Sequence, residues 1–432
     1  MRKKILGEYH FFLSMPRDMR LVLITNMIYA FVLPVIDIFV GAYIMGSADK
    51  DPAKMVAVYQ LCVYTGIPFT FLINGFLLKK IKISHLYSFG MLLSGISMLF
   101  MMTLSNIEMI GVSIAGFIMG ASFGFFWANR DFLTLDTTND SNRNYYYGLE
   151  TFFYTITFII VPAVIGWFIV QTKKNGWFDG NTSGAYQIVT GVVILLTIAA
   201  SIVIHQHKYS NPKQKKFLYL RFDRLWKKML GLASLKGMIQ GYLVTAPAIL
   251  IMTLVGDEGS LGTVQSISGI LTAFILYILG RTTKPKHRIY IFSTGMVIFL
   301  IGALANQILF SAVGVIIFVL CKVLFMPLHD IAYFPIQMRV IDILSVKEKR
   351  SEYAYIFNHE FGLYIGRFFG LVLFILFFYI SDEFALKYAL VIVAVIQLIS
   401  IPLAKNIIKY ADKTVDEVKS EHPNPDALNL DN

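Results

Sequence analysis

Charged side chains are scarce in this chain of 432 residues. Asp, Glu, Lys and Arg together make up 15% of it, whereas hydrophobic residues make up 56% and the mean hydropathy is +0.64. Soluble domains contain about 25% charged residues, so this composition excludes an ordinary soluble domain and predicts an integral membrane protein. A spanning helix needs about 20 apolar residues, so the chain is long enough for twelve spans and their loops.

Cysteines and catalytic motifs are also scarce. The two cysteines, Cys62 and Cys321, both lie inside apolar runs, which excludes a disulfide framework and a cysteine-based metal site. The sequence contains no phosphate-binding loop, nucleophile triad or cluster of metal ligands. We therefore expect a protein that is not an enzyme and that holds no cofactor or metal. The N-terminal segment lacks a small-residue cleavage site, so the first apolar run is expected to remain as a span.

Acidic residues are outnumbered by basic ones, 27 to 38, which gives a net charge of +11. The cations lie in short loops between apolar runs and in one long basic loop, from His205 to Ala233, whose only acid is Asp223. This distribution follows the positive-inside rule and argues against a nucleic-acid partner. With the N-terminus inside, only five of the 38 cations fall in outer loops. We therefore expect a plasma (inner) membrane protein with both termini in the cytoplasm.

Hydropathy predicts an all-α fold with twelve spans. They are expected near 21–45, 55–78, 85–105, 108–133, 145–170, 185–205, 235–256, 260–279, 288–306, 308–336, 353–379 and 385–405. Two long apolar runs contain a polar point, Ser105-Asn106 and Asn306-Gln307, and a tight turn is expected at each. The predicted organisation is a six-helix bundle (1–205), a basic cytoplasmic linker (206–233), a second six-helix bundle (234–405) and a polar cytoplasmic tail (406–432). We expect the tail to be disordered from Asp412 onward.

A weak internal repeat connects the two halves at an offset of 200–205 residues. It matches Asn106 with Asn306, Gly75 with Gly280, Gly90 with Gly295, and Asn129-Arg130 with His329-Asp330. Many transporters are built from such parallel repeats around a site at the membrane midplane, so the repeat favours two pseudo-symmetric halves.

Six plus six spans, a long basic central loop and short basic loops after spans 2 and 8 resemble the major facilitator superfamily over residues 15–410. The superfamily pattern after span 2 is Gly-x-Leu-x-Asp-Arg-x-Gly-Arg-Arg. Gly75, Leu77 and Lys80 match it, whereas Lys79 replaces the Asp and Lys82 replaces the second Gly. The charge-relay role of that Asp is therefore not expected here.

Two further segments match the superfamily less closely. The loop after span 8, from Gly280 to Lys286, keeps the glycine and the basic character, and span 5 contains Pro162 and Gly166 of an antiporter-type motif. The resemblance implies a transporter of two six-helix bundles that works by alternating access. It also implies that spans 1, 4, 7 and 10 line a cavity where Asp37, Arg130 and Lys322 would meet. We expect a monomer.

Span 1 supplies the first candidate site residues. Asn26, Tyr29, Leu33 and Asp37 follow helical spacing and are expected to share one face. Pro34 permits local unwinding beside Asp37. An ionisable residue in a span is costly and tends to face the interior, so Asp37 is a candidate proton carrier. The alternative is a solvated residue near the outer surface.

Span 10 contains Lys322, Met326, His329 and Tyr333 along one helical stripe. Lys322 is expected about half-way across the membrane, where a lysine must pair, line a wet cavity or lose its proton. We predict that it contacts the substrate, the alternative being a structural ion pair.

Other candidates lie in spans 4, 7, 10 and 11. The complete predicted substrate-binding set is Lys322, Arg130, Asn26, Tyr29, His329, Tyr333, Gln240 and Tyr242, and the predicted proton-coupling set is Asp37, Asp330 and Glu360. Glu360 and Arg367 are seven residues apart, so no direct bond between them is expected. Two glycine ridges, Gly116/Gly120/Gly124 and Gly362/Gly366/Gly370, predict close helix packing.

These features predict a secondary active transporter. Because no ATP-binding motif is present, the driving force is expected to be an ion gradient, most simply of protons. The mixed charges favour symport of a small polar or anionic organic solute, sugar-like or carboxylate-like, across the lipid bilayer. The alternative is a drug/proton antiporter that exports lipophilic cations.

Overall fold

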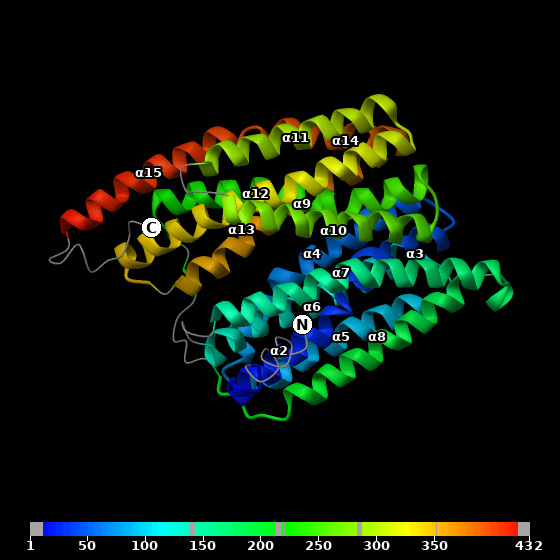
Figure 1. Ribbon diagram of the computed structural model, residues 1–432, viewed down its shortest axis with the longest axis horizontal. Helices are drawn as coiled ribbons and strands as arrows, with labels where there is room; N and C mark the ends of the chain where they lie inside the picture. Colours follow the sequence, from blue (N-terminus) through cyan, green and yellow to red (C-terminus); the bar gives the residue numbers. More distant parts are fainter. Residues whose placement is uncertain are drawn as a thin grey trace. The chain divides into compact units, whose positions relative to one another are not determined.

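The computed structural model describes residues 12–104, 106–138, 143–180, 182–211, 218–219, 221–282, 287–350 and 352–421. All regular elements in these ranges are helices (Figure 1), so the predicted all-α fold is confirmed. Among the described residues, eleven helical segments are long and apolar enough to cross a membrane, and each lies at a predicted span. Helix α10 (Glu258–Thr282) lies where the eighth span is predicted, but it is not one of these eleven. The predicted basic turn at 283–286 and the end of the tail at 422–432 lie outside the described residues.

The chain divides into two compact units. The first comprises residues 1–213 and 256–267, and the second comprises residues 214–255 and 268–432. The helices of the first unit are α2 (Arg17–Ala30), η1 (Val35–Phe39), α3 (Val40–Ser47), α4 (Pro52–Leu77), α5 (Ile83–Thr103), α6 (Met109–Thr137), α7 (Arg143–Lys174), η2 (Trp177–Gly180) and α8 (Ser183–Ile204). Those of the second are α9 (Arg224–Leu254), α11 (Arg288–Leu309), α12 (Ala312–Glu348), α13 (Glu352–Phe378), α14 (Asp382–Gln397) and α15 (Ser400–Glu421).

Helix α10 (Glu258–Thr282) belongs to both units, because its first turns pack in the first unit and the remainder packs in the second. Glu258 is buried and accepts a hydrogen bond from the Tyr186 hydroxyl of α8 at 3.3 Å. This contact explains why the unit boundary falls within α10 rather than only in the central loop.

Glycine ridges hold two pairs of neighbouring helices. A Cβ at Gly120 would overlap the carbonyl oxygen of Val63, so α6 can lie this close to α4 only without a side chain there. In the same way, a Cβ at Gly366 would overlap the carbonyl oxygen of Ser234, where α13 crosses α9. Small residues allow this close approach in membranes, and the predicted packing role of both ridges is confirmed.

Large apolar side chains cover much of the outer surface. Ile308, Ile110, Leu195 and Trp167 are each more than 60% exposed. Soluble proteins rarely expose so many large apolar side chains, whereas a lipid-facing surface requires them. The protein is therefore a multi-pass membrane protein.

The turn between α11 and α12 differs from the prediction. Helix α11 continues through Asn306-Gln307 and ends at Leu309, and the chain reverses at Phe310, whose φ is 31°. The Asn306 side chain donates a hydrogen bond to the Leu386 carbonyl of α14 at 3.0 Å. The predicted turn at Asn306 is wrong because this polar side chain connects two helices. The other expected turn is confirmed, since α5 ends at Thr103 and α6 begins at Met109.

The central loop is shorter than predicted, because α9 begins at Arg224. Asp223 caps this helix by accepting a hydrogen bond from the Leu225 amide at 2.7 Å. In the first unit, Asn211 donates hydrogen bonds to the carbonyls of Leu78 and Ile81, in the turn after α4. The loop is thus attached to a different unit at each end.

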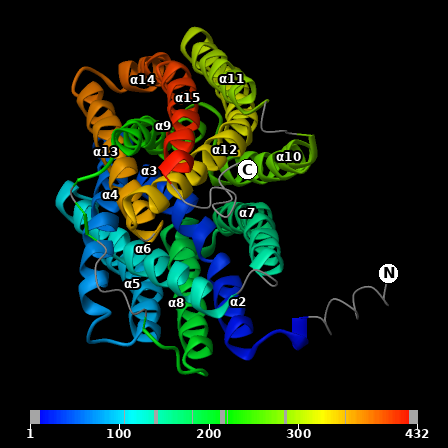
Figure 2. The same cartoon turned by 90° about the vertical axis from the view of Figure 1, so that its left-hand side faces the viewer.

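The predicted disorder of the tail from Asp412 is wrong up to residue 421. Helix α15 continues to Glu421 and lies beside α12 and α9 (Figure 2). Its buried stripe consists of Ala404, Ile407, Ala411 and Val415. These residues are spaced three to four apart, so one apolar face secures the helix while the charged face remains exposed.

Candidate functional site

The first span changes its helical geometry near its centre. Helix α2 ends at Ala30, and a turn leads through Pro34 into the π-helical turn η1. Proline removes a backbone donor, so the structure confirms the local unwinding predicted here. Asp37 lies on η1 with an exposed side chain, whereas Asn26 and Tyr29 are fully buried. Within the described residues, Asp37 has no hydrogen bond or ion pair.

A buried polar network in the first unit is centred on Arg130 and Glu150. The Arg130 guanidinium forms an ion pair with Glu150, its Nε donates to Glu150 Oε1 at 3.1 Å, and its Nη1 lies 2.6 Å from Asp131. Asn26 of α2 donates to Glu150 Oε1 at 2.6 Å and to the Tyr146 hydroxyl at 2.7 Å. The Tyr87 hydroxyl of α5 donates to the Asn26 side-chain oxygen. Four helices, α2, α5, α6 and α7, therefore meet through this network.

The structure brings two predicted residues, Arg130 and Asn26, together through Glu150. Tyr29 lies next to this group, and its ring packs on Phe126 with 4.3 Å between ring centroids. A carboxylate and a guanidinium in this arrangement stabilise one another only because further hydrogen bonds satisfy their remaining atoms.

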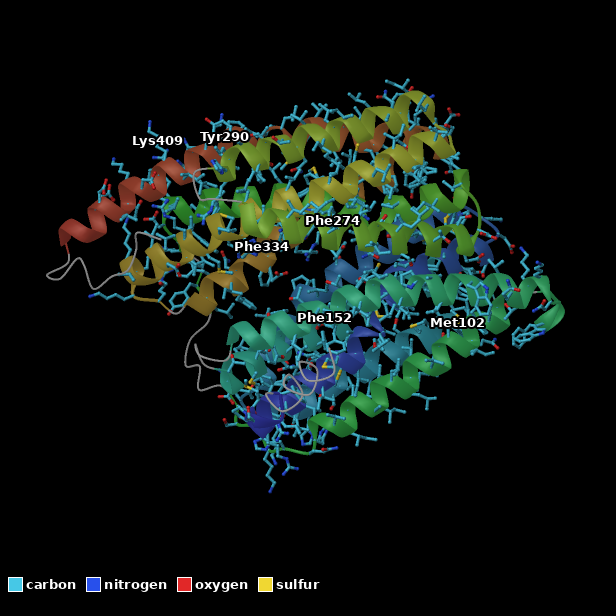
Figure 3. The ribbon with its side chains drawn as sticks, in the orientation of Figure 1. Met102, Phe152, Phe274, Tyr290, Phe334 and Lys409 are labelled. Atoms are coloured by element: carbon cyan, nitrogen blue, oxygen red, sulfur yellow. The ribbon has the colours of Figure 1, made fainter. Side chains whose placement is uncertain are left out.

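A second network lies in the other unit and contains Asp330. Lys236 Nζ of α9 lies 2.8 Å from Asp330 Oδ1, and His329 Nδ1 donates to the same oxygen at 2.8 Å. The lysine side chain is 3% exposed and the aspartate side chain 33%. Lys236 also lies 3.8 Å from the ring centroid of Phe334, which is labelled in Figure 3. Asp330 is thus half of a structural ion pair in this conformation.

The predicted stripe along span 10 is confirmed for His329 and Tyr333. Their rings stack with 5.3 Å between centroids. The Tyr333 hydroxyl lies 2.6 Å from His359 Nε2, so α12 and α13 are connected at this point.

Gln240, Glu360 and Arg367 form a third group, between α9 and α13. Arg367 Nη2 donates to Gln240 Oε1 at 2.8 Å, and Arg367 Nη1 lies 3.7 Å from Glu360 Oε2. The expectation that Glu360 and Arg367 do not pair is wrong, because the long arginine side chain extends along the helix over two turns.

Tyr242, in contrast, is packed between helices. It is fully buried, its ring lies 4.9 Å from that of Phe374, and its hydroxyl has no hydrogen-bond partner within the described residues.

Lys322 differs from every cation described above. It is half-buried in α12, ten residues after Ala312, which places it about 15 Å along the helix. The hydrocarbon layer of a membrane is about 30 Å thick, so this distance places Lys322 near the middle of the layer. In the part of the chain that the structure describes, Lys322 has neither a hydrogen bond nor an ion pair.

The sequence interpretation missed Glu150 and Lys236. Both are nearly fully buried, at 2% and 3% exposure. Each lies close to the predicted start of a span, where a long charged side chain normally reaches the membrane surface. The signal that could have identified both residues is an ionisable side chain within a predicted span. Helix α9 also begins eleven residues before the predicted start at 235, so Lys236 lies well inside the helix.

Among the described residues, there is no cluster of three or more His, Cys, Asp or Glu side chains that could hold a metal ion.

Known proteins are similar to this chain in sequence and in fold. An uncharacterised protein from Bacillus subtilis (strain 168), YqgE, is 21% identical over 293 residues, which cover 66% of this chain and 64% of that protein. An uncharacterised protein encoded in the sodM 3′ region of Geobacillus stearothermophilus is 24% identical over 153 residues, which cover 35% of this chain and 71% of that protein. The chain thus spans somewhat less than two thirds of the first relative.

Two solved structures share the fold. A mutant of the nucleoside transporter NupG matches with a TM-score of 0.62 and 14% identity, covering 91% of this chain and 100% of the other. A bacterial homologue of the human drug peptide transporters PepT1 and PepT2 matches with a TM-score of 0.66 and 12% identity, covering 92% and 99%. The family model of the Major Facilitator Superfamily matches residues 21–371. The chain therefore belongs to the Major Facilitator Superfamily, whose members are transporters and not enzymes.

Proposed function

We propose that this protein is a proton-coupled secondary transporter of a small polar or anionic organic solute, such as a sugar or a carboxylate. The observation that carries the proposal is the pair of charges, Asp37 and Lys322, that have no partner within the described residues. Each lies deep in a membrane-spanning segment. An ionisable residue costs about 2.5–3.5 kcal/mol at the centre of a span, so one that forms no ion pair there is suited to binding an ion or a solute.

The two charges suit different tasks. A carboxylate on a π-helical turn, as at Asp37, can take up and release a proton. An ammonium such as that of Lys322 attracts a carboxylate or a hydroxyl-rich solute and repels a lipophilic cation. This repulsion disfavours the alternative, a drug/proton antiporter, to which Asp37 is suited but Lys322 is not.

The paired groups have a second proposed role. Arg130 and His329 each contact a carboxylate of the protein, Glu150 and Asp330. We propose that a solute carboxylate takes the place of Glu150 or Asp330 during the transport cycle. Further residues of the proposed solute-binding set are Asn26, Tyr29, Gln240, Tyr242 and Tyr333. The termini are proposed to be cytoplasmic, because the basic loops are then inside.

A ligand panel tests the solute class. Purified full-length protein is melted in detergent with sugars, carboxylates, nucleosides, peptides and cationic dyes. A ligand present at 100 times its Kd stabilises the folded state by about 2.7 kcal/mol. We expect stabilisation by a polar or anionic solute and none by the dyes. Stabilisation by cationic dyes alone would contradict the proposal and support the antiporter alternative.

A further inference from the structure

A cavity lies inside the second unit, at the end of the helices where α15 packs. Its volume is about 240 Å³. The lining residues come from α11, α12 and α15: Arg288, Ile336, Arg339, Val340, Ile407, Ile408 and Ala411. One water occupies about 30 Å³ of liquid, so the cavity has room for a group the size of a phosphate with a few attached carbons. Its walls combine two cations with five apolar side chains.

The described residues supply one carboxylate, that of Asp412, for the two arginines. Arg288, the first residue of α11, has no hydrogen bond or ion pair in the described parts of the chain. Arg339 pairs with Asp412 at 2.8 Å through Nη1, but its Nε is buried and, within the same described residues, lacks a hydrogen-bond partner. Both arginines line the same cavity, so two like charges repel one another there. Two guanidiniums against one carboxylate leave one positive charge in excess.

Two guanidinium groups that line one cavity are suited to an oxyanion. Each presents forked N–H donors that match the oxygens of a phosphate, and a bound anion would remove the repulsion between the two cations. The apolar walls of Ile336, Val340 and Ile407 match a carbon skeleton attached to that anion.

The side chains around the cavity are of the kinds found where a membrane meets water. Tyr290 of α11, two residues after Arg288, is 73% exposed, and tyrosine is enriched where membrane meets water. Helix α15, which contacts α11, exposes Lys405, Lys409 and Lys413 on its outer face. Figure 3 shows Tyr290 and Lys409 pointing outward from these two helices. The proposed topology places the start of α11 and the end of α15 on the cytoplasmic side. Basic pockets between spanning helices on that side bind phosphorylated lipid headgroups.

We propose that this cavity binds a phosphate oxyanion and that the phosphate is the headgroup of an anionic phospholipid. The phosphate lies between Arg288 and Arg339, and the glycerol carbons contact the apolar walls. A free phosphate ion would use the same donors but not the apolar walls, which is why the lipid is the favoured source.

The test measures melting of the full-length protein in detergent with phosphatidylglycerol, phosphatidylcholine or inorganic phosphate. We expect phosphatidylglycerol to raise the melting temperature more than phosphatidylcholine does. Arg288→Gln, which breaks no ion pair within the described residues, should weaken the response to phosphatidylglycerol about tenfold in concentration. Lys174→Gln removes an exposed cation of α7, which belongs to the first unit, and serves as the matched control, with an unchanged response.

A second variant makes the test independent of any loss of stability. Asp412→Asn removes the carboxylate that competes for Arg339, so the response to phosphatidylglycerol should occur at lower lipid concentration. Equal responses to the two lipids, or equal losses in Arg288→Gln and Lys174→Gln, would overturn the proposal. Stabilisation by inorganic phosphate that is lost in Arg288→Gln, without a preference for phosphatidylglycerol, would overturn the lipid source and assign the cavity to a free anion.

Discussion

Asp330→Asn is expected to lower the free energy of unfolding by about 3–5 kcal/mol, because it leaves the Lys236 ammonium buried without its carboxylate. The lysine side chain is only 3% exposed, so water cannot replace the lost partner. Lys236→Met should cost less, since the remaining Asp330 carboxylate is 33% exposed and keeps the hydrogen bond from His329. Thermal melting of the purified variants in one detergent measures both effects.

The double variant Lys236→Met/Asp330→Asn provides the control. It removes both charges at once and should recover most of the stability lost in Asp330→Asn, because a buried ion pair contributes little over an apolar pair. An Asp330→Asn protein that melts like the wild type would show that the pair is not structural. Asp330 would then return as a proton-coupling candidate.

Lys322→Gln is expected to have the opposite signature, an unchanged melting temperature and a loss of most solute affinity. Lys322 has no hydrogen bond or ion pair in the described chain, so its removal leaves no protein charge unpaired. Loss of one charge-assisted hydrogen bond to the solute weakens binding on the order of tenfold to a hundredfold. The measurement is a binding titration beside a melting curve on the same preparation, with the solute that the ligand panel identifies.

Lys322→Arg separates charge from geometry. The guanidinium keeps the charge but presents it as a planar fork, so binding should lie between that of the wild type and that of Lys322→Gln. A Lys322→Gln protein with lower stability and unchanged affinity would contradict the assignment and indicate a structural lysine.

The fold could be predicted from the sequence because apolar run length and loop charge are local properties. The glycine ridges at Gly120 and Gly366 were predictable for the same reason, since a small residue on every fourth position already defines a stripe on one helix. The turn expected at Asn306 was wrong because hydropathy cannot distinguish a polar side chain in a turn from one that binds a carbonyl of another helix, here that of Leu386.

The candidate site was only partly predictable, because pairing is a tertiary property. Arg130 and Asp330 could be found as ionisable residues in apolar runs, but their partners, Glu150 and Lys236, come from helices 20 and 94 residues away in sequence. The same limit applies to Lys322. Its depth followed from its position in the span, whereas its lack of a partner among the described residues became visible only with the helices packed.

Proton movement coupled to solute entry tests the central claim most directly. The protein is reconstituted into liposomes that contain a pH-sensitive dye, with equal pH on both sides, and the solute identified by the panel is added outside. We predict that solute entry acidifies the interior, and that Asp37→Asn abolishes the acidification while labelled solute still exchanges down its gradient. Solute entry without any internal pH change in the wild type, or full acidification in Asp37→Asn, would contradict the account.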